Sequence, residues 1–235
     1  MKNLGTLIAA IALTATVAST ASAGITSTTT FRDTLDTPFF PGTGNSNQDF
    51  AITRSTESAG LFAGNTVELG LKAKRRFFGQ TGVGGSGGLY IVQPGFSPTS
   101  GAAGAPDDPT RAWWNFDFSV DYGDLRDNTN TMVTLTIADI EGDILPIPFV
   151  PSATFPVGAQ LAQDSWNTGF GFLSAPLGGF DPSVAGDYTL TFAAVGVGNG
   201  EDLGSVSITV RVIPTPGAVA LAGLGGLAAT RRRRA

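Results

Sequence analysis

Three carboxylates alternate around a glycine in the segment Asp139-Ile140-Glu141-Gly142-Asp143. Oxygen ligands at this spacing suit Ca²⁺, so Asp139, Glu141 and Asp143 form a candidate calcium site. The segment is not an EF-hand loop, which carries its glycine at the sixth position and a glutamate at the twelfth. A solvent-exposed β-turn is the alternative interpretation, and calcium is the only cofactor that the sequence suggests.

A second set of acidic residues lies nearby, at Asp117, Asp121, Asp124 and Asp127. Like charges this close favour a bound cation or a raised pKa. A glycan hydrolase also needs two carboxylates, about 5–10 Å apart, on either side of its substrate. The sequence offers many acidic pairs and shows no cleft, so we expect a non-catalytic protein and keep a secreted glycan hydrolase as an alternative.

Trp113 is the candidate carbohydrate contact. It precedes Trp114, and two neighbouring residues of a strand point to opposite faces, so one indole is expected in the core and the other could be exposed. An exposed indole can stack on a sugar ring, which favours a carbohydrate-binding module. The alternative is that Trp113 packs beneath the loop at residues 94–109.

Basic residues gather at one place in the central part of the chain. Lys72, Lys74 and Arg76 alternate along one strand face, and Arg75 points to the other. This patch could bind an acidic polysaccharide, and a solvated strand face is the alternative.

The chain of 235 residues contains no cysteine and no histidine. Disulfides, thiol chemistry, histidine-based triads and most zinc sites are therefore excluded. Any remaining catalysis would need paired carboxylates, a tyrosine, a lysine or a serine–lysine pair.

The elements that position these residues are strands. Apolar and polar residues alternate with period two at 114–121, 131–138, 187–194 and 203–213, and more weakly at 49–53, 66–78 and 88–93. With 32 glycines and 14 prolines the turns should be frequent. We predict an all-β domain at residues 24–212, an antiparallel β-sandwich that is immunoglobulin-like or jelly-roll-like.

One local pattern supports the sandwich. The segment at 180–190 runs from a loop into a strand, with Gly186 two residues before Tyr188. This arrangement resembles the tyrosine corner of Greek-key sandwiches, in which the tyrosine hydroxyl bonds to the backbone of the preceding loop.

The N-terminal residues 1–23 have the layout of a secretory signal peptide. Lys2 precedes an apolar run at 4–17, and Ala21 and Ala23 form a small-residue cleavage site for signal peptidase before Gly24.

The C-terminal residues 213–235 have three parts in order. They are Pro214-Thr215-Pro216, a stretch without charges up to residue 230, and the cluster Arg231, Arg232, Arg233 and Arg234. Residues 212–230 could span a bilayer core as a helix with the arginines on the cytoplasmic side. Ala218, Ala222 and Gly226 recur every four residues, so they form a small-residue face against which another membrane helix can pack.

This tail resembles the PEP-CTERM sorting signal, with Thr215 in place of the usual central glutamate. The resemblance implies processing by an exosortase, a membrane transpeptidase-like enzyme of bacteria that produce exopolysaccharide. A plain membrane anchor is the alternative.

The net charge of the part between the two end segments indicates which partners to expect. Five of the 14 basic residues lie in the two end segments, which leaves 9 basic against 19 acidic residues between them. Such an acidic surface does not suit nucleic acid or anionic lipid, so membrane contact is expected through the C-terminal helix only. We expect an exported protein, tethered transiently to the inner membrane and then located in the envelope, in the matrix or outside the cell. Its expected role is structural or adhesive, in association with exopolysaccharide.

Overall fold

The structure is a computed structural model that describes residues 24–42, 44–79, 85–138, 144–149, 155–167, 169–170, 184–198 and 200–213. In these residues all regular structure is β, with twelve strands and no helix. The all-β prediction is therefore confirmed. The expected signal peptide and the tail from residue 214 onward lie outside the described residues.

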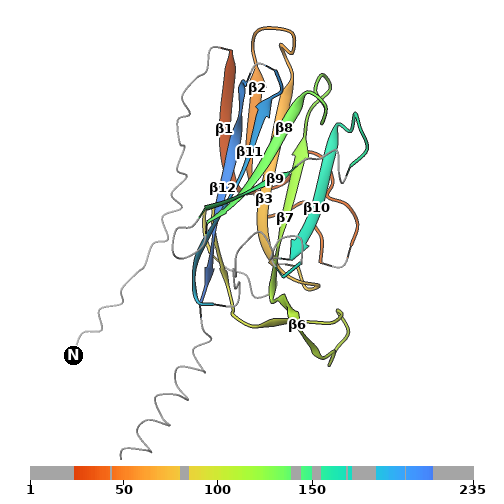
Figure 1. Cartoon of the computed structure of the whole chain (residues 1–235), viewed down its shortest axis with the longest axis vertical. Coiled ribbons are helices and arrows are strands. Elements are labelled where there is room, and N and C mark those ends of the chain that lie inside the picture. The colour runs from red at the N-terminus through yellow and green to blue at the C-terminus, as the bar shows by residue number, and fades with distance from the viewer. Residues whose placement is uncertain are drawn as a thin grey trace, which may run out of the picture.

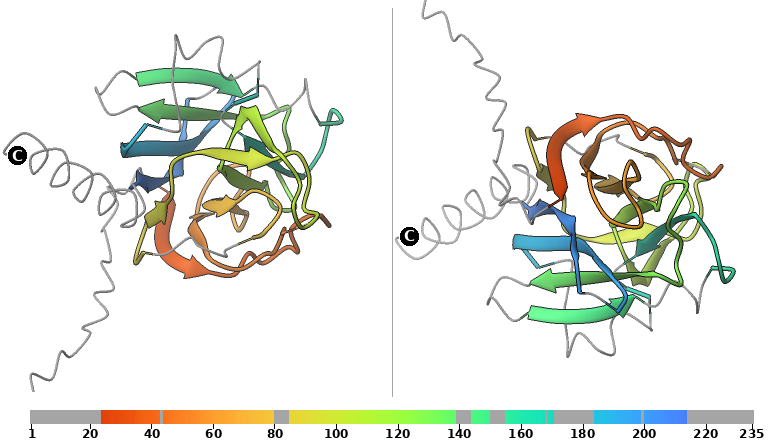
Figure 2. Two further views of the ribbon diagram at one scale, coloured as in Figure 1. Left: turned by 90° about the horizontal axis from the view of Figure 1, so that it is seen from below. Right: turned by 90° about the horizontal axis from the view of Figure 1, so that it is seen from above.

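Ten of the twelve strands form two five-stranded sheets that face each other (Figures 1 and 2). The first sheet has the order β1 (Ile25–Asp33), β2 (Phe50–Glu57), β3 (Thr66–Arg75), β7 (Trp114–Asp121) and β10 (Leu161–Asn167). The second has the order β4 (Leu89–Val92), β12 (Asp202–Val212), β11 (Gly186–Gly196), β8 (Thr131–Ala138) and β9 (Ile144–Phe149). A small hairpin of β5 (Phe96–Pro98) and β6 (Asp107–Ala112) projects at one end of the molecule (Figure 1).

The antiparallel prediction holds for every described strand pair except one. Strand β4 runs parallel to β12, with Leu89 opposite Thr209 and Val92 opposite Val212. Because β4 lies at the sheet edge, one parallel pair leaves the antiparallel pairing of β12, β11, β8 and β9 unchanged.

The main core lies between the two sheets, where β12 packs on β2 and β3. The four apolar residues predicted on one face of β7, from Trp114 to Val120, are all buried there. The ring of Phe118 lies 5.6 Å from that of Phe192 on β11, which joins the two layers. The aromatic and aliphatic residues at alternate strand positions thus fill the interior, as period two requires.

The opposite face of the first sheet is also covered, which the sequence did not predict. The connection between β1 and β2, at residues 34–42 and 44–49, crosses this face, and we call it the covering segment. Its Leu35 and Phe39 form a second core cluster with Phe50 and Ile52 of β2. Polar residues on this face of β7 are therefore buried as well, with Asp117 fully enclosed.

The tyrosine corner is confirmed, because the Tyr188 hydroxyl donates a hydrogen bond of 2.9 Å to the Val184 carbonyl. We expect Tyr188→Phe to lower the free energy of unfolding by about 0.5–1.5 kcal/mol, the net value of one hydrogen bond. The Tyr122 hydroxyl is also buried, but it has no hydrogen-bond partner among the described residues. Tyr122→Phe is thus a matched control that should leave stability unchanged or higher, and urea unfolding of both variants tests the difference. An equal loss in the two variants would argue against the corner.

Candidate functional site

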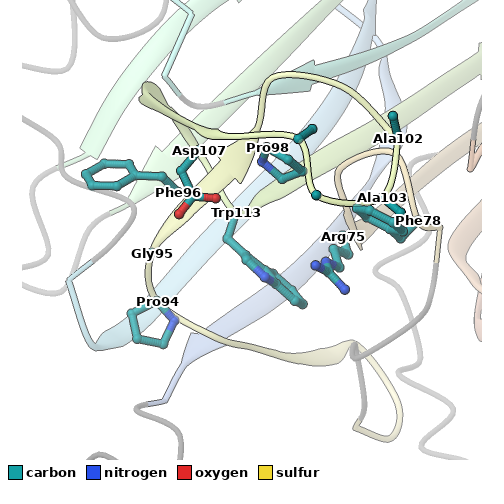
Figure 3. A pocket seen from close by; sticks show the side chains of 12 residues that line it. Arg75, Phe78, Pro94, Gly95, Phe96, Pro98, Ala102, Ala103, Asp107 and Trp113 are labelled. Carbon is teal, nitrogen blue, oxygen red and sulfur yellow. The ribbon is translucent and has the colours of Figure 1, made fainter.

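The candidate site is a pocket at the end of the sandwich that carries the β5–β6 hairpin (Figures 1 and 3). It has a volume of about 420 Å³ and lies between the end of β3, the residues just before β7 and the segment from Pro94 to Asp107. The side chains that shape it are Arg75, Phe78, Pro94, Pro98, Asp107 and Trp113.

Trp113 forms one wall of this pocket. It lies between β6 and β7, and its backbone is fixed on both sides: its N–H donates to the Gly95 carbonyl at 2.9 Å, and its carbonyl accepts from the Arg76 N–H at 3.2 Å. The side chain is only 9 % exposed, and Trp114 is fully buried. The interpretation in which Trp113 packs beneath the loop at residues 94–109 is therefore confirmed, because the 94–107 segment folds over it. What remains accessible of Trp113 faces the pocket (Figure 3).

Arg75 lies beside Trp113 and is held by aromatic rings. Its guanidinium carbon is 4.1 Å from the centre of the Phe78 ring and 5.1 Å from that of Trp113. Within the part of the chain that the structure describes, Arg75 forms no ion pair, and its buried Nε has no hydrogen-bond partner. A guanidinium stacked in this way keeps its planar set of N–H donors available for a carboxylate, sulfate or phosphate.

Two further arginines lie close to the pocket. Arg76 donates to the Ser97 hydroxyl at 3.2 Å, and Arg111 donates to the Gly169 carbonyl at 2.7 Å. Burial, and then the charge of Arg111, lower the pKa of Arg76, while Asp108 acts in the opposite direction. The two arginines are thus near enough to interact, and with Arg75 they make this end of an otherwise acidic domain locally cationic.

A second pocket, of about 540 Å³, is acidic. It is lined by Asp36, Glu68, Asp121 and Asp124 together with small and polar residues. Burial raises the pKa of Glu68 to about 7, against the opposing charge of Arg54 at 2.6 Å. The Glu68 carboxylate also accepts from the Asp36 N–H, so its oxygens are already in use. No aromatic side chain lines this pocket, and the described residues contain no group of three or more potential metal ligands.

The prediction of a basic strand face at the surface is wrong for Lys72 and Lys74. Lys72 and Lys74 are buried, at 0 % and 2 % exposure, because the covering segment lies over them. They surround Asp117, which sits on the neighbouring strand β7. Asp117, which the sequence grouped with Asp121 as a candidate cation ligand, is instead paired with these two buried lysines. Of the predicted basic patch, only Arg75 and Arg76 lie near the pocket.

The other predicted site residues lie outside the described residues. This holds for the processing positions Ala21, Ala23, Pro214, Thr215, Pro216 and Arg231 to Arg234, for the helix face of Ala218, Ala222 and Gly226, and for the candidate calcium ligands Asp139, Glu141 and Asp143. In the ranges that are described, no helix is long and apolar enough to cross a membrane.

Sequence reasoning named Trp113 and Arg75 in separate candidate sites, did not predict that they lie side by side, and missed Phe78. The signal was present in the run Lys74-Arg75-Arg76-Phe77-Phe78, where two arginines precede two aromatic residues at the end of a strand. Positive φ at Phe77, at 66°, turns the chain so that Phe78 folds back over Arg75. Period-two alternation does not encode such a turn.

Comparison with known proteins gave no match to any family model, curated protein or solved structure.

Proposed function

We propose that this chain is an exported, non-catalytic surface or matrix protein whose β-sandwich binds acidic polysaccharide at the Arg75–Trp113 pocket. The observation that carries the proposal is the guanidinium of Arg75, stacked on two aromatic rings and free of any described acid partner. The 9 basic residues of the domain face 19 acidic ones, so an unpaired arginine in a pocket is the feature most in need of a ligand.

The chemistry of the pocket favours a sugar that carries a carboxylate. A planar guanidinium can bind a carboxylate with two parallel hydrogen bonds, and the adjacent indole edge offers an apolar surface for a sugar ring. Asp107 on the rim can accept hydrogen bonds from sugar hydroxyl groups. A uronic acid residue satisfies all three contacts.

In this proposal the two end segments determine where the β domain is located. A cleavable leader at 1–23 and a PEP-CTERM-like tail at 213–235 deliver the domain through signal peptidase and an exosortase to the envelope, the matrix or the medium. The sandwich itself is of the immunoglobulin-like or jelly-roll-like type in this proposal, supported by the two facing sheets and the tyrosine corner. The calcium site at Asp139, Glu141 and Asp143 stays a prediction.

We expect Arg75→Gln to weaken binding of an alginate hexasaccharide by about 10- to 100-fold, because a hydrogen bond to a charged group contributes about 1.5–3 kcal/mol. Trp113→Ala should weaken it as well, and isothermal titration calorimetry measures both. Arg211→Gln is the matched control: it removes the same charge from an exposed pair on the other sheet and should leave affinity within about twofold.

Maltohexaose, a neutral oligosaccharide, separates the rival functions. Equal binding of maltohexaose and the alginate hexasaccharide, unaffected by Arg75→Gln, would indicate a carbohydrate-binding module for neutral glycans and contradict the proposed ligand. Release of shorter sugars, lost on Asp121→Asn, would indicate a glycan hydrolase instead. Absence of binding to either sugar by a folded protein would leave a purely structural role.

A further inference from the structure

A cluster of charged side chains is enclosed beneath the covering segment, with each of the three at 2 % exposure or less. Asp117 is fully buried on β7, between Lys72 and Lys74 of the neighbouring strand β3. The Lys74 Nζ lies 3.0 Å from Asp117 Oδ1, and the Lys72 Nζ lies 3.5 Å from Asp117 Oδ2. Two ammonium groups thus share one carboxylate, so the enclosed cluster holds one positive charge in excess.

Lys72 has its own set of acceptors. Its Nζ donates to the Ser46 carbonyl at 2.5 Å and to the Gln48 carbonyl at 3.3 Å, both in the covering segment, and it lies 4.3 Å from the centre of the Phe50 ring. Burial lowers the pKa of Lys72 to about 8, with Asp117 opposing this shift and Lys74 adding to it. The groups that accept these hydrogen bonds from Lys72 in the covering segment are therefore backbone carbonyls, which do not react with an amine.

Lys74 has a different neighbour. In addition to its ion pair with Asp117, its Nζ donates a hydrogen bond to Oδ1 of Asn45, a residue of the covering segment. The amide nitrogen of Asn45 is also held in place, since Nδ2 donates to the Phe40 carbonyl at 3.3 Å. The hydrogen bond makes the Lys74 amine and the Asn45 carboxamide direct neighbours. Attack on Cγ then requires only that Nζ move from the plane of the amide to its face.

We propose that Lys74 and Asn45 form an intramolecular isopeptide bond, with Asp117 as the group that carries the proton. The enclosed geometry brings both an amide electrophile and a carboxylate next to one nucleophile, the buried Lys74 amine. These are the parts that an uncatalysed amide exchange lacks in solution.

The atoms of the step balance without any co-reactant. The Lys74 ammonium passes a proton to Asp117, and its neutral Nζ then forms a bond to Cγ of Asn45. The second amine proton moves by way of Asp117 to Nδ2, the Cγ–Nδ2 bond breaks, and ammonia leaves from the half-buried side of Asn45. Asp117 then passes the first proton to the departing ammonia. The products are a secondary amide, ammonium and the ionised Asp117 carboxylate, with no change in oxidation state.

Two physical reasons favour this bond over the unlinked state. Acylation removes the charge of Lys74, so a single enclosed ammonium remains opposite a single carboxylate and the excess charge is gone. The bond also joins the covering segment to the centre of the first sheet, which restricts the unfolded chain as a disulfide would in a protein that has no cysteine. A bond from either lysine to Asp117 is disfavoured, because an ionised carboxylate is a poor electrophile.

Peptide mapping of the full chain tests the proposal. After denaturation and trypsin digestion we expect a branched peptide that joins residues 33–54 to residues 73–75, because an acylated Lys74 is not cleaved. Its mass should be about 17 Da below the sum of the two linear peptides, the mass of the ammonia that leaves. Lys74→Arg keeps the positive charge but cannot form the bond, so its digest should lack the branched peptide.

Two further variants serve as controls, and one competing reaction must be distinguished. Lys72→Arg changes the neighbouring buried lysine and should keep the branched peptide. Asn45→Ala, in the half-buried covering segment, should abolish it even if Lys74→Arg fails to fold. Succinimide formation at an asparagine also removes about 17 Da, but it leaves the peptides linear and persists in Lys74→Arg. Linear 33–54 peptide throughout the folded wild type, or a loss of about 18 Da that links a lysine to Asp117, would overturn the proposal.

Discussion

Replacing Asp117 with asparagine is expected to lower the free energy of unfolding by about 3–5 kcal/mol, the cost of removing one partner from a buried ion pair. The side chain keeps its shape, so in chains without the proposed Lys74–Asn45 bond the loss is electrostatic: Lys72 and Lys74 remain enclosed at 0 % and 2 % exposure without a counter-charge. For a domain whose total stability is about 5–15 kcal/mol, this approaches unfolding at ambient temperature.

Urea unfolding followed by circular dichroism measures this loss. Asp187→Asn is the matched control, because Asp187 pairs with Arg211 at 2.7 Å but is 46 % exposed. An exposed pair contributes about 0–1 kcal/mol, so the same chemical change should have little effect there. A similar loss at both positions would show that the Asp117 cluster is not enclosed as described.

A compensating variant separates charge from packing. Combining Asp117→Leu with Lys72→Met and Lys74→Met replaces all three charges with apolar side chains. Since apolar replacement of buried ion clusters is often neutral or stabilising, the triple variant should be clearly more stable than Asp117→Asn. Failure of the triple variant to recover stability would indicate that the covering segment depends on the carbonyl contacts of Lys72.

The second large effect is expected at Arg126, which is 1 % exposed. Its guanidinium makes two hydrogen bonds to Glu57, at 2.6 and 2.8 Å, a third to Glu201 at 3.1 Å, and lies 3.8 Å from the centre of the Phe62 ring. The residue therefore joins the β2–β3 hairpin, the β7–β8 connection and the β11–β12 turn. Arg126→Met should cost about 3–5 kcal/mol, because the buried Glu57 carboxylate loses its counter-charge.

Thermal unfolding provides the measurement for Arg126. For a domain of this size each kcal/mol lowers Tm by about 2–4 °C, so a fall of about 6–20 °C is expected. Adding Glu57→Gln should recover part of this fall by removing the unpaired charge, whereas Arg211→Met, at an exposed pair, should shift Tm by only a few degrees. If Glu57→Gln lowers Tm further in the Arg126→Met background, the ion pair is not the source of the effect.

The sequence by itself determined the strands of the interior. Alternation at 114–121 and 131–138 matches β7 and β8, and the weaker patterns at 66–78 and 88–93 match β3 and β4 to within a few residues. The Tyr188 hydrogen bond also followed from local pattern. Each of these features depends on neighbours in the chain, since period two alone decides which side chains share a face.

The same reasoning missed β1, whose serine- and threonine-rich sequence has no apolar alternation. Strand β1 is fixed by its pairing with β2, where Ser27 meets Ser55 at 2.7 Å and Thr29 meets Thr53 at 2.8 Å through their hydroxyl groups. Cross-strand pairs of this kind depend on the partner strand and leave no periodic signal in one segment.

Only the tertiary structure decided which strand faces are covered. Alternation places Lys72 and Lys74 on the same face of β3, but whether that face meets water depends on the covering segment, which is anchored by Leu35 and Phe39 on a neighbouring strand. The pocket has the same origin, because Arg75 and Trp113 come together only through the pairing of β3 with β7 and a turn at Phe77. Local sequence sets the direction of each side chain, while its surroundings, and hence its charge state and reactivity, are set by segments far away in the chain.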